Sequence, residues 1–389
     1  MSHLWLPYRQ MKTAPPPLVV ERTDGVRLYL TDGRELIDGI ASWWTACHGY
    51  NHPHIRAMVA AQLERLPHVM LGGLANAPAL ALAERLAALL PGDLDHVFFT
   101  ESGSVSVEVA MKMALQYRMN RGEHERTRFL SFRGAYHGDT FAAMSVCDPE
   151  EGMHRLFGSM LPKQVIASLP HDEDAARELE RTVAAHAREL TAVVLEPLVQ
   201  AAGGMKFHSP QTLARVAATA RRFDLLLILD EIAVGFGRTG TLFACEQAGI
   251  VPDIITLSKA FTGGTMPLAA TVASTRVYEA FLSDDSDKAL MHGPTYSGHA
   301  LACAAANASL DLFAAEPRLE QVAAIAAQLT REPKLEPLRA RFVRHGVWVR
   351  PFGDVVYLMP PFVIGQRDLT ILTTAIYDVL REAAAAGEL

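Results

Sequence analysis

From about residue 95 to residue 275, short apolar runs alternate with longer amphipathic stretches, and this alternation constrains the fold more than any other feature. Continuous apolar runs are typical of strands that are buried on both faces of a parallel sheet. Amphipathic helices between the runs are the connections that such a sheet needs. We therefore predict an α/β fold with a mostly parallel central sheet and helices on both faces. The runs are HVFFT, RFLSF, VIASL, AVVLE, LLLILD, IITLSK and LAATVAS.

The two ends of the chain have a different pattern. Residues 25–38, GVRLYLTDGRELID, are typical of a β-hairpin with Asp-Gly in its turn. The residues after 315 mix short strand-like and helix-like stretches. We therefore expect a large domain of residues 43–315, and a smaller α+β domain that combines residues 1–42 with residues 316–389.

The composition excludes several classes of function. The 389 residues are 50% hydrophobic and 20% charged, with a net charge of −7 and no block of like charges. This balance argues against nucleic acid or an anionic membrane as the main partner. No apolar run approaches the roughly 20 residues of a membrane span, and the N-terminus lacks a signal pattern. The four cysteines are widely spaced, which favours reduced thiols in a cytoplasmic protein, and we expect no metal site.

Three of the apolar runs end in an ionisable residue, namely Glu196, Asp230 and Lys259. Functional groups gather at the carboxyl ends of parallel strands, because loops and helix N-termini meet there. A lysine at the end of a buried strand is costly to desolvate unless it is used or neutralised. Each residue alone is compatible with a structural ion pair, and the three together favour a functional site at this edge.

Residues 100–118, TESGSVSVEVAMKMALQYR, indicate a strand end, a Ser-Gly-Ser turn and a helix. Ser102 and Ser104 are suited to capping that helix. The same geometry presents free backbone N–H groups and the positive end of the helix dipole to an anion such as a phosphate.

The loop GAYHGDT, residues 134–140, brings together Tyr136, His137 and Asp139. A His-Asp pair suggests general-base chemistry, although no nucleophile motif accompanies it. Tyr136 offers an aromatic face for stacking on a flat ligand, and core packing would suit it equally well.

The sequence gives only weak support for a nucleotide-binding site in either of two places. GFGRTG, residues 235–240, matches the dinucleotide pattern GxGxxG, but it neither follows a strand directly nor opens a helix. A glycine-rich turn that carries Arg238 is the better interpretation. Asp230 and Glu231 could hold magnesium beside a nucleotide, but that arrangement requires a P-loop, which the sequence does not contain.

Pyridoxal 5′-phosphate requires the groups that this sequence supplies. It needs an amine for a Schiff base, a carboxylate that keeps the pyridine nitrogen protonated, an aromatic ring over the pyridine and a helix N-terminus for the phosphate. Lys259 supplies the amine, Asp230 the carboxylate and Tyr136 the ring. We therefore predict pyridoxal 5′-phosphate as the cofactor and these three residues as the catalytic residues.

The segments LILDEIAVGFGRTG, LSKAFTGGTMPL and MHGPTYSGHALACAAANASL resemble the class III aminotransferases of fold type I. Within that family, IASWWTACHGYNHPHI and GVWVRPFGDVVYLMPP resemble the aminotransferases of biotin biosynthesis that convert 8-amino-7-oxononanoate to 7,8-diaminononanoate. The resemblance implies ping-pong transamination with S-adenosylmethionine as amino donor, in a cytoplasmic homodimer with active sites at the interface. Lysine as donor and another class III activity, on ω-amino acids or diamines, are the alternatives.

The resemblance also assigns roles to residues, with Lys259 as the Schiff-base lysine. The implied cofactor-binding residues are Ser102, Gly103, Ser104, Tyr136, Asp230, Lys259, Pro294 and Thr295, of which the last two reach the partner subunit's cofactor. The implied substrate-binding residues are Tyr8, Trp44, Asp139, Gly293, Arg350 and Tyr357. This set suits a long, mostly apolar keto acid whose carboxylate pairs with the guanidinium of Arg350.

The sequence departs from the family pattern between AAQLTRE and PKLEPLRARFVRHGVW, where it is shorter by a couple of dozen residues. The family carries a strand pair of its C-terminal domain there. A cofactor-binding homologue without catalytic activity is the alternative that this gap suggests. The presence of Lys259, Asp230 and Tyr136 argues against that alternative.

Overall fold

The computed structural model describes residues 3–150, 153–329, 339–349 and 356–385. Its centre is a seven-stranded sheet in which β12 runs antiparallel to both neighbours and the other described pairs are parallel. The predicted mostly parallel sheet is therefore confirmed. In spatial order the strands are β4 (His96–Thr100), β12 (Ala269–Ala273), β11 (Ile254–Leu257), β10 (Leu226–Asp230), β7 (Leu190–Leu195), β5 (Arg128–Phe132) and β6 (Val165–Ala167).

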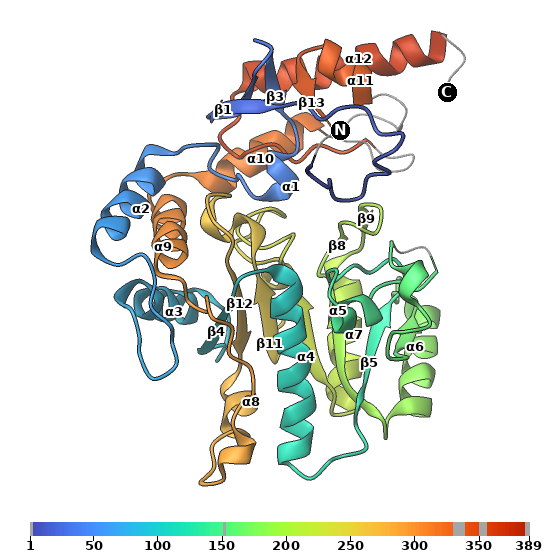
Figure 1. The fold of residues 1–389 in the computed structure, drawn as a ribbon. Helices are drawn as coiled ribbons and strands as arrows, with labels where there is room; N and C mark the ends of the chain where they lie inside the picture. Colours follow the sequence, from blue (N-terminus) through green and yellow to red (C-terminus); the bar gives the residue numbers. More distant parts are fainter. Residues whose placement is uncertain (1–2, 151–152, 330–338, 350–355, 386–389) are drawn as a thin grey trace.

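Helices cover both faces of this sheet (Figure 1). Successive residues of β10 point to opposite faces, as the two-residue repeat of a strand requires. Leu226 and Ile228 pack in the core beneath α4 (Gly103–Asn120). Leu227 and Leu229 pack in the other core, with α6 (Glu173–His186) and α7 (Pro210–Arg222). Burial on both faces explains why the strands are continuously apolar in sequence.

A second sheet joins the two ends of the chain. Its order is β1 (Val20–Asp24), β2 (Arg27–Leu30), β3 (Glu35–Asp38) and β13 (Val347–Trp348). The predicted hairpin is confirmed, because β2 and β3 are antiparallel and flank the turn that contains Gly33. β13 adds to β3 in parallel, and α12 (Gln366–Ala385) packs against this sheet. The division into two domains at residues 43 and 315 stays a prediction.

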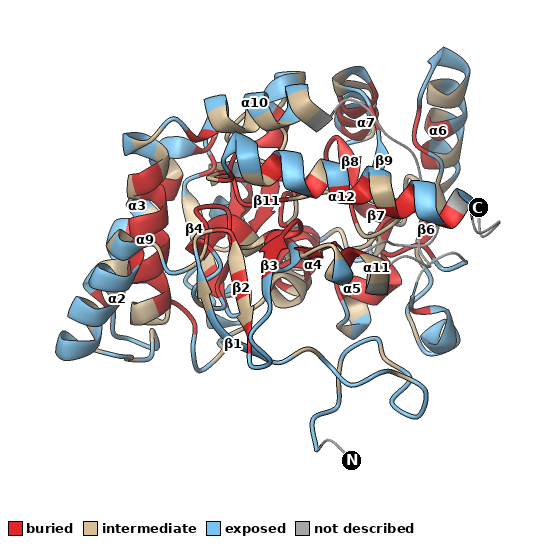
Figure 2. Cartoon of the chain, turned by 90° about the horizontal axis from the view of Figure 1, so that it is seen from above, coloured by how far each residue is buried: buried red, intermediate tan, exposed pale blue. Residues whose placement is uncertain are grey.

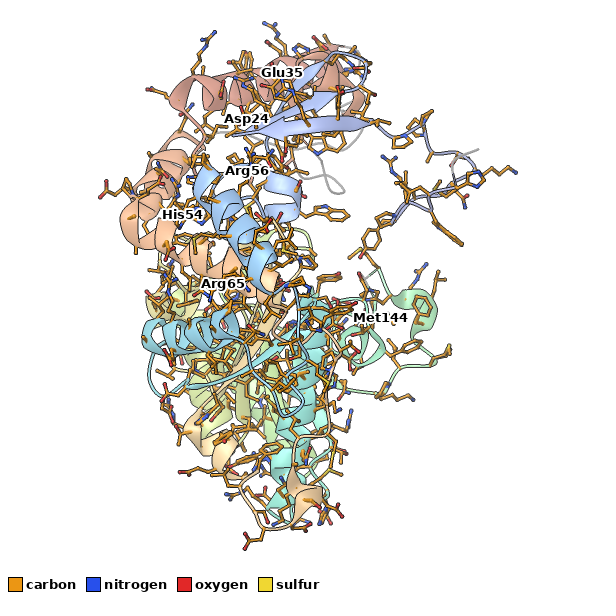
Figure 3. All side chains as sticks on the ribbon, turned by 60° about the vertical axis from the view of Figure 1, so that its left-hand side comes forward. Asp24, Glu35, His54, Arg56, Arg65 and Met144 are labelled. Carbon is orange, nitrogen blue, oxygen red and sulfur yellow. The ribbon has the colours of Figure 1, made fainter. Side chains whose placement is uncertain are left out.

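The remaining elements connect these two sheets or flank them. Figure 2 shows α9 as a mostly buried helix between α3 and the exposed α2. Figure 3 labels His54 on α2, whose Nε2 lies 2.8 Å from Asp311 Oδ2 on α9. The elements are α1 (Ala41–Trp44), α2 (Pro53–Arg65), α3 (Ala77–Leu89), α5 (Phe141–Ser145), η1 (Arg155–Phe157), β8 (Val199–Gln200), β9 (Lys206–Phe207), η2 (Ala244–Ala248), η3 (Lys259–Thr262), α8 (Thr275–Glu279), η4 (Ser286–Lys288), α9 (Ala300–Ala315), α10 (Arg318–Leu329) and α11 (Arg339–Arg344).

Candidate active site

A cavity of about 170 Å³ lies at the carboxyl edge of the large sheet, where β5, β7, β10 and β11 end. The sheet places Asp230 at the last position of β10, Glu196 just after β7 and Lys259 at the start of η3. The structure therefore brings the three strand-end groups of the sequence together. The predicted residues that line this cavity are Trp44, Ser102, Gly103, Ser104, Tyr136, Asp230 and Lys259.

The Asp230 carboxylate is buried and hydrogen-bonded on both oxygens. Oδ1 accepts the backbone N–H of Ile232 at 3.0 Å and the Thr256 hydroxyl at 3.4 Å. Oδ2 lies 2.8 Å from Nδ1 of His137, which is also buried. Burial acts to lower the pKa of His137, but the hydrogen bond to Asp230 and the charges of Asp230 and Glu196 outweigh it and raise that pKa. The raised pKa favours the protonated form of His137, whose Nδ1–H then donates to the Asp230 carboxylate.

Lys259 lies beside Trp44, with its Nζ 5.0 Å from the ring centroid. Burial lowers the pKa of the Lys259 ammonium, against the opposing charges of Asp230, Glu196 and Asp139. A lowered pKa increases the fraction of neutral amine, which is the nucleophilic form. Lys259 also has a positive φ of 46°, an uncommon backbone conformation at the turn from β11 into η3.

The N-terminus of α4 opens on the same cavity. Ser102 caps it by accepting the Val105 backbone N–H at 3.3 Å. Ser104 Oγ instead accepts the Asp139 N–H at 3.0 Å, which ties the helix to the loop after β5. Gly138 has a φ of +127°, and a Cβ there would lie 2.8 Å from Cα of Ser104. The close approach of these two backbones forms a cradle that suits a phosphate.

These observations test whether the residues present fit pyridoxal phosphate, and they do. The cavity offers a buried amine with a lowered pKa, the carboxyl group of Asp230, which is hydrogen-bonded to His137, and the N–H groups of a helix N-terminus. It also offers Tyr136 in its lining. In the part of the chain that the structure describes, no cluster of His, Cys, Asp and Glu is suited to a metal ion.

Glu196 is a second buried carboxylate in the lining, and the sequence-based assignment of catalytic and binding residues omits it. Its two oxygens accept the backbone N–H groups of Tyr136 at 2.9 Å and Ala201 at 3.0 Å. Burial raises the pKa of Glu196 to about 7. The sequence signal for Glu196 was its strand-end position, and for His137 it was the neighbouring Tyr and Asp. Neither signal identified its hydrogen-bond partner.

Tyr8 and Asp139 meet beside Tyr136, which lines the cavity, but neither of the two is among the lining residues of either cavity. The Tyr8 hydroxyl donates to Asp139 Oδ2 at 2.7 Å and lies 3.5 Å from the Tyr136 hydroxyl. His154 Nε2 lies 2.8 Å from Asp139 Oδ1, and this hydrogen bond is the main reason why the pKa of Asp139 is lowered. The ring of His154 stacks on that of Tyr136, with centroids 5.7 Å apart. Figure 3 shows that the N-terminal segment reaches across to the region of α5, where Met144 is labelled.

Trp43 and Trp44 lie in a left-handed turn that the sequence did not predict. The φ angles of Ala41, Ser42, Trp43 and Trp44 are 47°, 48°, 56° and 72°. A left-handed helical residue with a side chain costs roughly 1–2 kcal/mol. The turn buries Trp44 against Tyr357, at 6.2 Å between centroids, while Trp43 remains 40% exposed.

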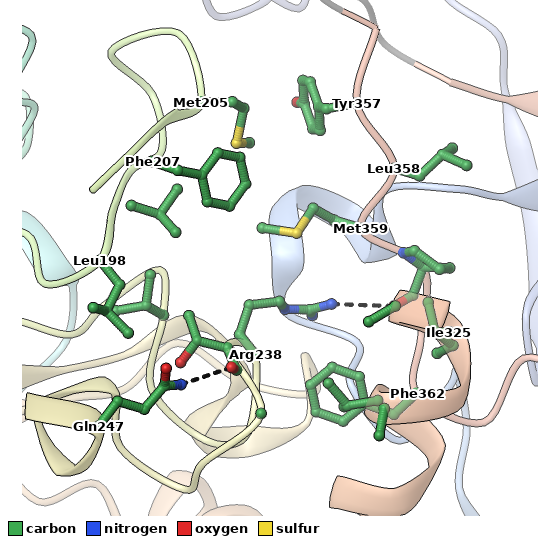
Figure 4. A pocket seen from close by; sticks show the side chains of 18 of the residues that line it. Leu198, Met205, Phe207, Arg238, Gln247, Ile325, Tyr357, Leu358, Met359 and Phe362 are labelled. Atoms are coloured by element: carbon green, nitrogen blue, oxygen red, sulfur yellow. Dashed lines mark hydrogen bonds between the residues drawn. The ribbon is translucent and has the colours of Figure 1, made fainter. Parts of the chain in front are cut away.

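A larger cavity of about 660 Å³ is linked to the first one through Trp44, which contacts Tyr357 and Arg238 in its lining, and Figure 4 shows that this lining is mostly apolar. Tyr357 lines it, and so does Arg238, whose guanidinium donates to the carbonyl oxygens of Pro360 and Trp44 at 3.2 and 3.3 Å and lies 4.5 Å from the ring centroid of Phe362. The side chain of Arg238 is half-buried, and desolvation lowers its pKa to about 10. The glycine-rich sequence around Arg238 predicts only a turn and gives no indication of this cavity.

Some predicted residues are not at either cavity. Gly293, Pro294 and Thr295 lie between η4 and α9 and are absent from both sets of described lining residues. Their assignment to a partner subunit's cofactor stays a prediction. Arg350 lies outside the described residues.

Among the helices that the structure describes, none is long and apolar enough to cross a membrane.

Comparison with known proteins identifies the family. Residues 8–340 match the family described as aminotransferase class-III. The chain belongs to the class III aminotransferases. It is therefore a pyridoxal-phosphate-dependent aminotransferase with an α/β fold, and these predictions are confirmed. The adenosylmethionine-8-amino-7-oxononanoate aminotransferase of Mycobacterium leprae is 42% identical to it over 414 aligned residues, which cover 97% of this chain and 95% of the relative. The alignment is longer than this chain of 389 residues, so the relative contains residues that this aminotransferase lacks.

Solved structures of transaminases with two different names resemble this aminotransferase almost equally well. The crystal structure of adenosylmethionine-8-amino-7-oxononanoate aminotransferase from Methanocaldococcus jannaschii has a TM-score of 0.93 and 32% identity, and the match covers 98% of this chain and 97% of that chain. An amine transaminase from an uncultivated Pseudomonas species, in its PLP-bound form, has a TM-score of 0.91 and 31% identity, with 98% and 99% covered.

Proposed function

We propose that this aminotransferase transfers an amino group from S-adenosylmethionine to 8-amino-7-oxononanoate and thereby forms 7,8-diaminononanoate. The names of its relatives support this reaction. The structural observation that carries it is that Lys259 and Asp230 line a cavity whose Trp44 contacts Tyr357 and Arg238, and that these two residues line a larger, mostly apolar cavity in which Arg238 is a half-buried cation. A site with these features is suited to transfer of an amino group to a substrate that has a long apolar chain and a terminal carboxylate.

The roles proposed for the residues follow from their contacts. Pyridoxal phosphate supplies, when bound, an electron sink that carries the amino group from the first substrate to the second. Asp230, held by His137, is the acceptor for the protonated pyridine nitrogen. The N–H groups at the start of α4, with Ser102, Gly103 and Ser104, hold the phosphate.

Lys259 anchors the cofactor with Nζ and, once this amine is free, takes a proton from the substrate carbon that carries the amino group. Its lowered pKa increases the fraction of Nζ that is neutral and can accept this proton. Tyr136 covers one face of the cavity, and its backbone is fixed by Glu196. Because donor and acceptor use the same Lys259, the two half-reactions alternate in a ping-pong sequence.

For the substrate side, we propose that Trp44 and Tyr357 form an apolar wall, and that Tyr8 and Asp139 bind polar groups beside Tyr136. The proposed partner for the carboxylate of the keto acid is Arg350. We further propose a cytoplasmic homodimer, in which Gly293, Pro294 and Thr295 of one subunit reach the site of the other. In this proposal residues 43–315 form the large domain.

A donor panel tests the reaction. The purified protein, loaded with pyridoxal phosphate, is mixed in turn with S-adenosylmethionine, lysine and an ω-amino acid, and the visible absorbance of the cofactor is recorded. We expect S-adenosylmethionine to convert the cofactor, and lysine and the ω-amino acid not to. Addition of 8-amino-7-oxononanoate to the converted enzyme should then restore the spectrum. Conversion by lysine alone would identify lysine as the donor.

An ω-amino acid or amine transaminase is the second candidate, because the solved amine transaminase matches this fold nearly as well. In that case the ω-amino acid converts the cofactor rapidly, and S-adenosylmethionine leaves the spectrum unchanged. A preparation that is colourless and takes up no pyridoxal phosphate would overturn both candidates.

A further inference from the structure

The strained turn Ala41–Trp44 is held by one buried side chain, Asp38, which no part of the proposed function uses. Asp38 is the last residue of β3 and is fully buried. Its Oδ1 accepts the Ile40 N–H at 2.9 Å, and its Oδ2 accepts the Ser42 N–H at 3.0 Å and the Tyr50 hydroxyl at 2.5 Å. The carboxylate thus binds backbone N–H groups before and within the left-handed turn.

Further contacts complete this support. The Tyr50 hydroxyl donates to Asp38 and lies 2.5 Å from Ser42 Oγ, so it can accept from the serine hydroxyl. The Tyr50 backbone is fixed to Gly25 of the β1–β2 turn by hydrogen bonds in both directions. The Thr45 side chain donates to the Ser42 carbonyl at 3.0 Å. Such contacts over-determine a conformation that four consecutive residues with side chains would otherwise avoid.

The strain has a consequence at the active site. Within this one turn, Trp44 is directed to Lys259, at 5.0 Å from ring centroid to Nζ, and to Tyr357. The Trp44 carbonyl accepts from Arg238 at 3.3 Å. Trp43, the preceding residue, is directed to Tyr8, with ring centroids 6.3 Å apart. A right-handed turn would be less strained, but it would place the two indoles differently relative to the backbone.

We propose that Asp38 is a positioning residue for substrate binding. Its carboxylate holds Ala41–Trp44 in the left-handed conformation that directs Trp44 to Lys259 and Trp43 to Tyr8. The inference rests on the proposed placement of Trp44 on the substrate side. It does not depend on which amino donor or keto acid the enzyme uses.

The variant Asp38→Asn tests the proposal, because one of the two acceptor oxygens becomes an NH₂ group that faces N–H donors. The first measurement is the quenching of tryptophan fluorescence when pyridoxal phosphate binds. Trp44→Phe identifies the part of this quenching that Trp44 contributes. We expect Asp38→Asn to remove at least about half of that part and to raise the KM of the keto acid about tenfold, with kcat changed less.

A second substitution separates positioning from general stability. Ser42→Gly lowers the cost of a positive φ, whereas Ser42→Ala removes the same hydroxyl without lowering that cost. In the Asp38→Asn background, Ser42→Gly should restore most of the Trp44 quenching and of the KM, and Ser42→Ala should restore neither. Ser42→Gly alone should leave both within about twofold of the unmodified protein.

The proposal is overturned if Asp38→Asn leaves the Trp44 quenching and the KM unchanged, or if the two Ser42 substitutions rescue equally. If Asp38→Asn does not fold, folding of the Ser42→Gly double variant but not of the Ser42→Ala one supports the proposal. Failure of both double variants to fold contradicts it, because Asp38 would then support the fold as a whole. The fluorescence result stands even if the donor panel contradicts the proposed reaction, so the two failures are distinguishable.

Discussion

The cofactor side and the substrate side of the candidate site are constructed differently. On the cofactor side, Glu196, Asp230 and Lys259 follow the neighbouring strands β7, β10 and β11, and both carboxylates are buried and hydrogen-bonded. On the substrate side, Trp44 and Tyr357 come from distant parts of the sequence and meet through long-range packing.

The difference shows which structural elements determine the residue positions on each side of the site. The parallel sheet fixes the cofactor side, since strands that run together must end together. A strained turn, an N-terminal segment and the residues after 355 fix the substrate side, and a change in any of them alters its shape. We therefore expect substitutions on the cofactor side to reduce the rate with every substrate, and those on the substrate side to act on KM and specificity.

The largest effect is expected for Lys259→Ala. Loss of the anchoring amine and of the base should lower turnover by at least about 10⁴-fold in both half-reactions. The fold should persist, because removal of a lysine whose pKa is lowered by burial also removes a desolvation cost. Stopped-flow absorbance and circular dichroism measure the two results, with the exposed Lys163→Ala as control. Full activity of Lys259→Ala would refute the assignment.

The next effect is expected for Asp230→Asn, at about 10²–10³-fold in both half-reactions. A neutral amide stabilises the protonated pyridine less, and it leaves His137 without its carboxyl partner. A pH titration of the cofactor's visible absorbance should shift as well. The matched control is Glu231→Gln, because that carboxylate is also buried but accepts the N–H groups of Ala244 and Cys245 instead. Equal losses in the two variants would contradict a specific role for Asp230.

The same contrast explains what the sequence could predict. A short apolar run that ends in Asp230 or Lys259 is a local pattern. Because the carboxyl ends of parallel strands lie at the same edge of a sheet, this local pattern also predicts that the two residues are close in space. The left-handed turn at residues 41–44 depends on Asp38 and Tyr50 across a strand boundary, so no local pattern indicates it.

Arg238 was missed for a similar reason. In sequence it follows glycines in a turn, and its packing against Phe362 depends on contact between residues 124 positions apart. His137 was noticed but not assigned, because its role depends on which carboxylate it contacts. The resemblance to a family supplied Tyr8 and Tyr357, which local physical chemistry would not have distinguished from core or surface residues.

A smaller effect, confined to one substrate, is expected for Arg350→Ala. Loss of a charge-assisted pair with the keto acid's carboxylate should raise its KM about 10- to 100-fold. The affinity for pyridoxal phosphate, followed by absorbance, should not change. Arg238→Ala is the comparison, since Arg238 is a half-buried cation in the lining of the larger cavity. A larger rise in KM for Arg238→Ala than for Arg350→Ala would assign the carboxylate to Arg238.

The smallest effect concerns Glu196 and appears in stability. The pKa of this carboxyl is raised from 4.5 to about 7 in the folded protein, so the stability it contributes is fully present below pH 4.5 and is lost as the pH rises through 7. Between pH 5 and pH 7.5 the cofactor-free protein should lose about 2 kcal/mol through this group. In Glu196→Gln that loss should disappear, as measured by urea unfolding at both pH values.

The controls for Glu196 come from two other glutamates. Glu231→Gln should flatten the pH dependence to a similar extent, because burial also raises the pKa of Glu231 to about 7. Glu173→Gln, at an exposed position on α6, should leave it unchanged. If Glu196→Gln and Glu173→Gln have the same pH dependence as the unmodified protein, Glu196 is already ionised at pH 5 in the folded state. The backbone N–H of Tyr136 would then be bound by a carboxylate that stays ionised from pH 5 to pH 7.5. The cofactor side would carry one more negative charge at pH 5 than a pKa of about 7 for Glu196 implies.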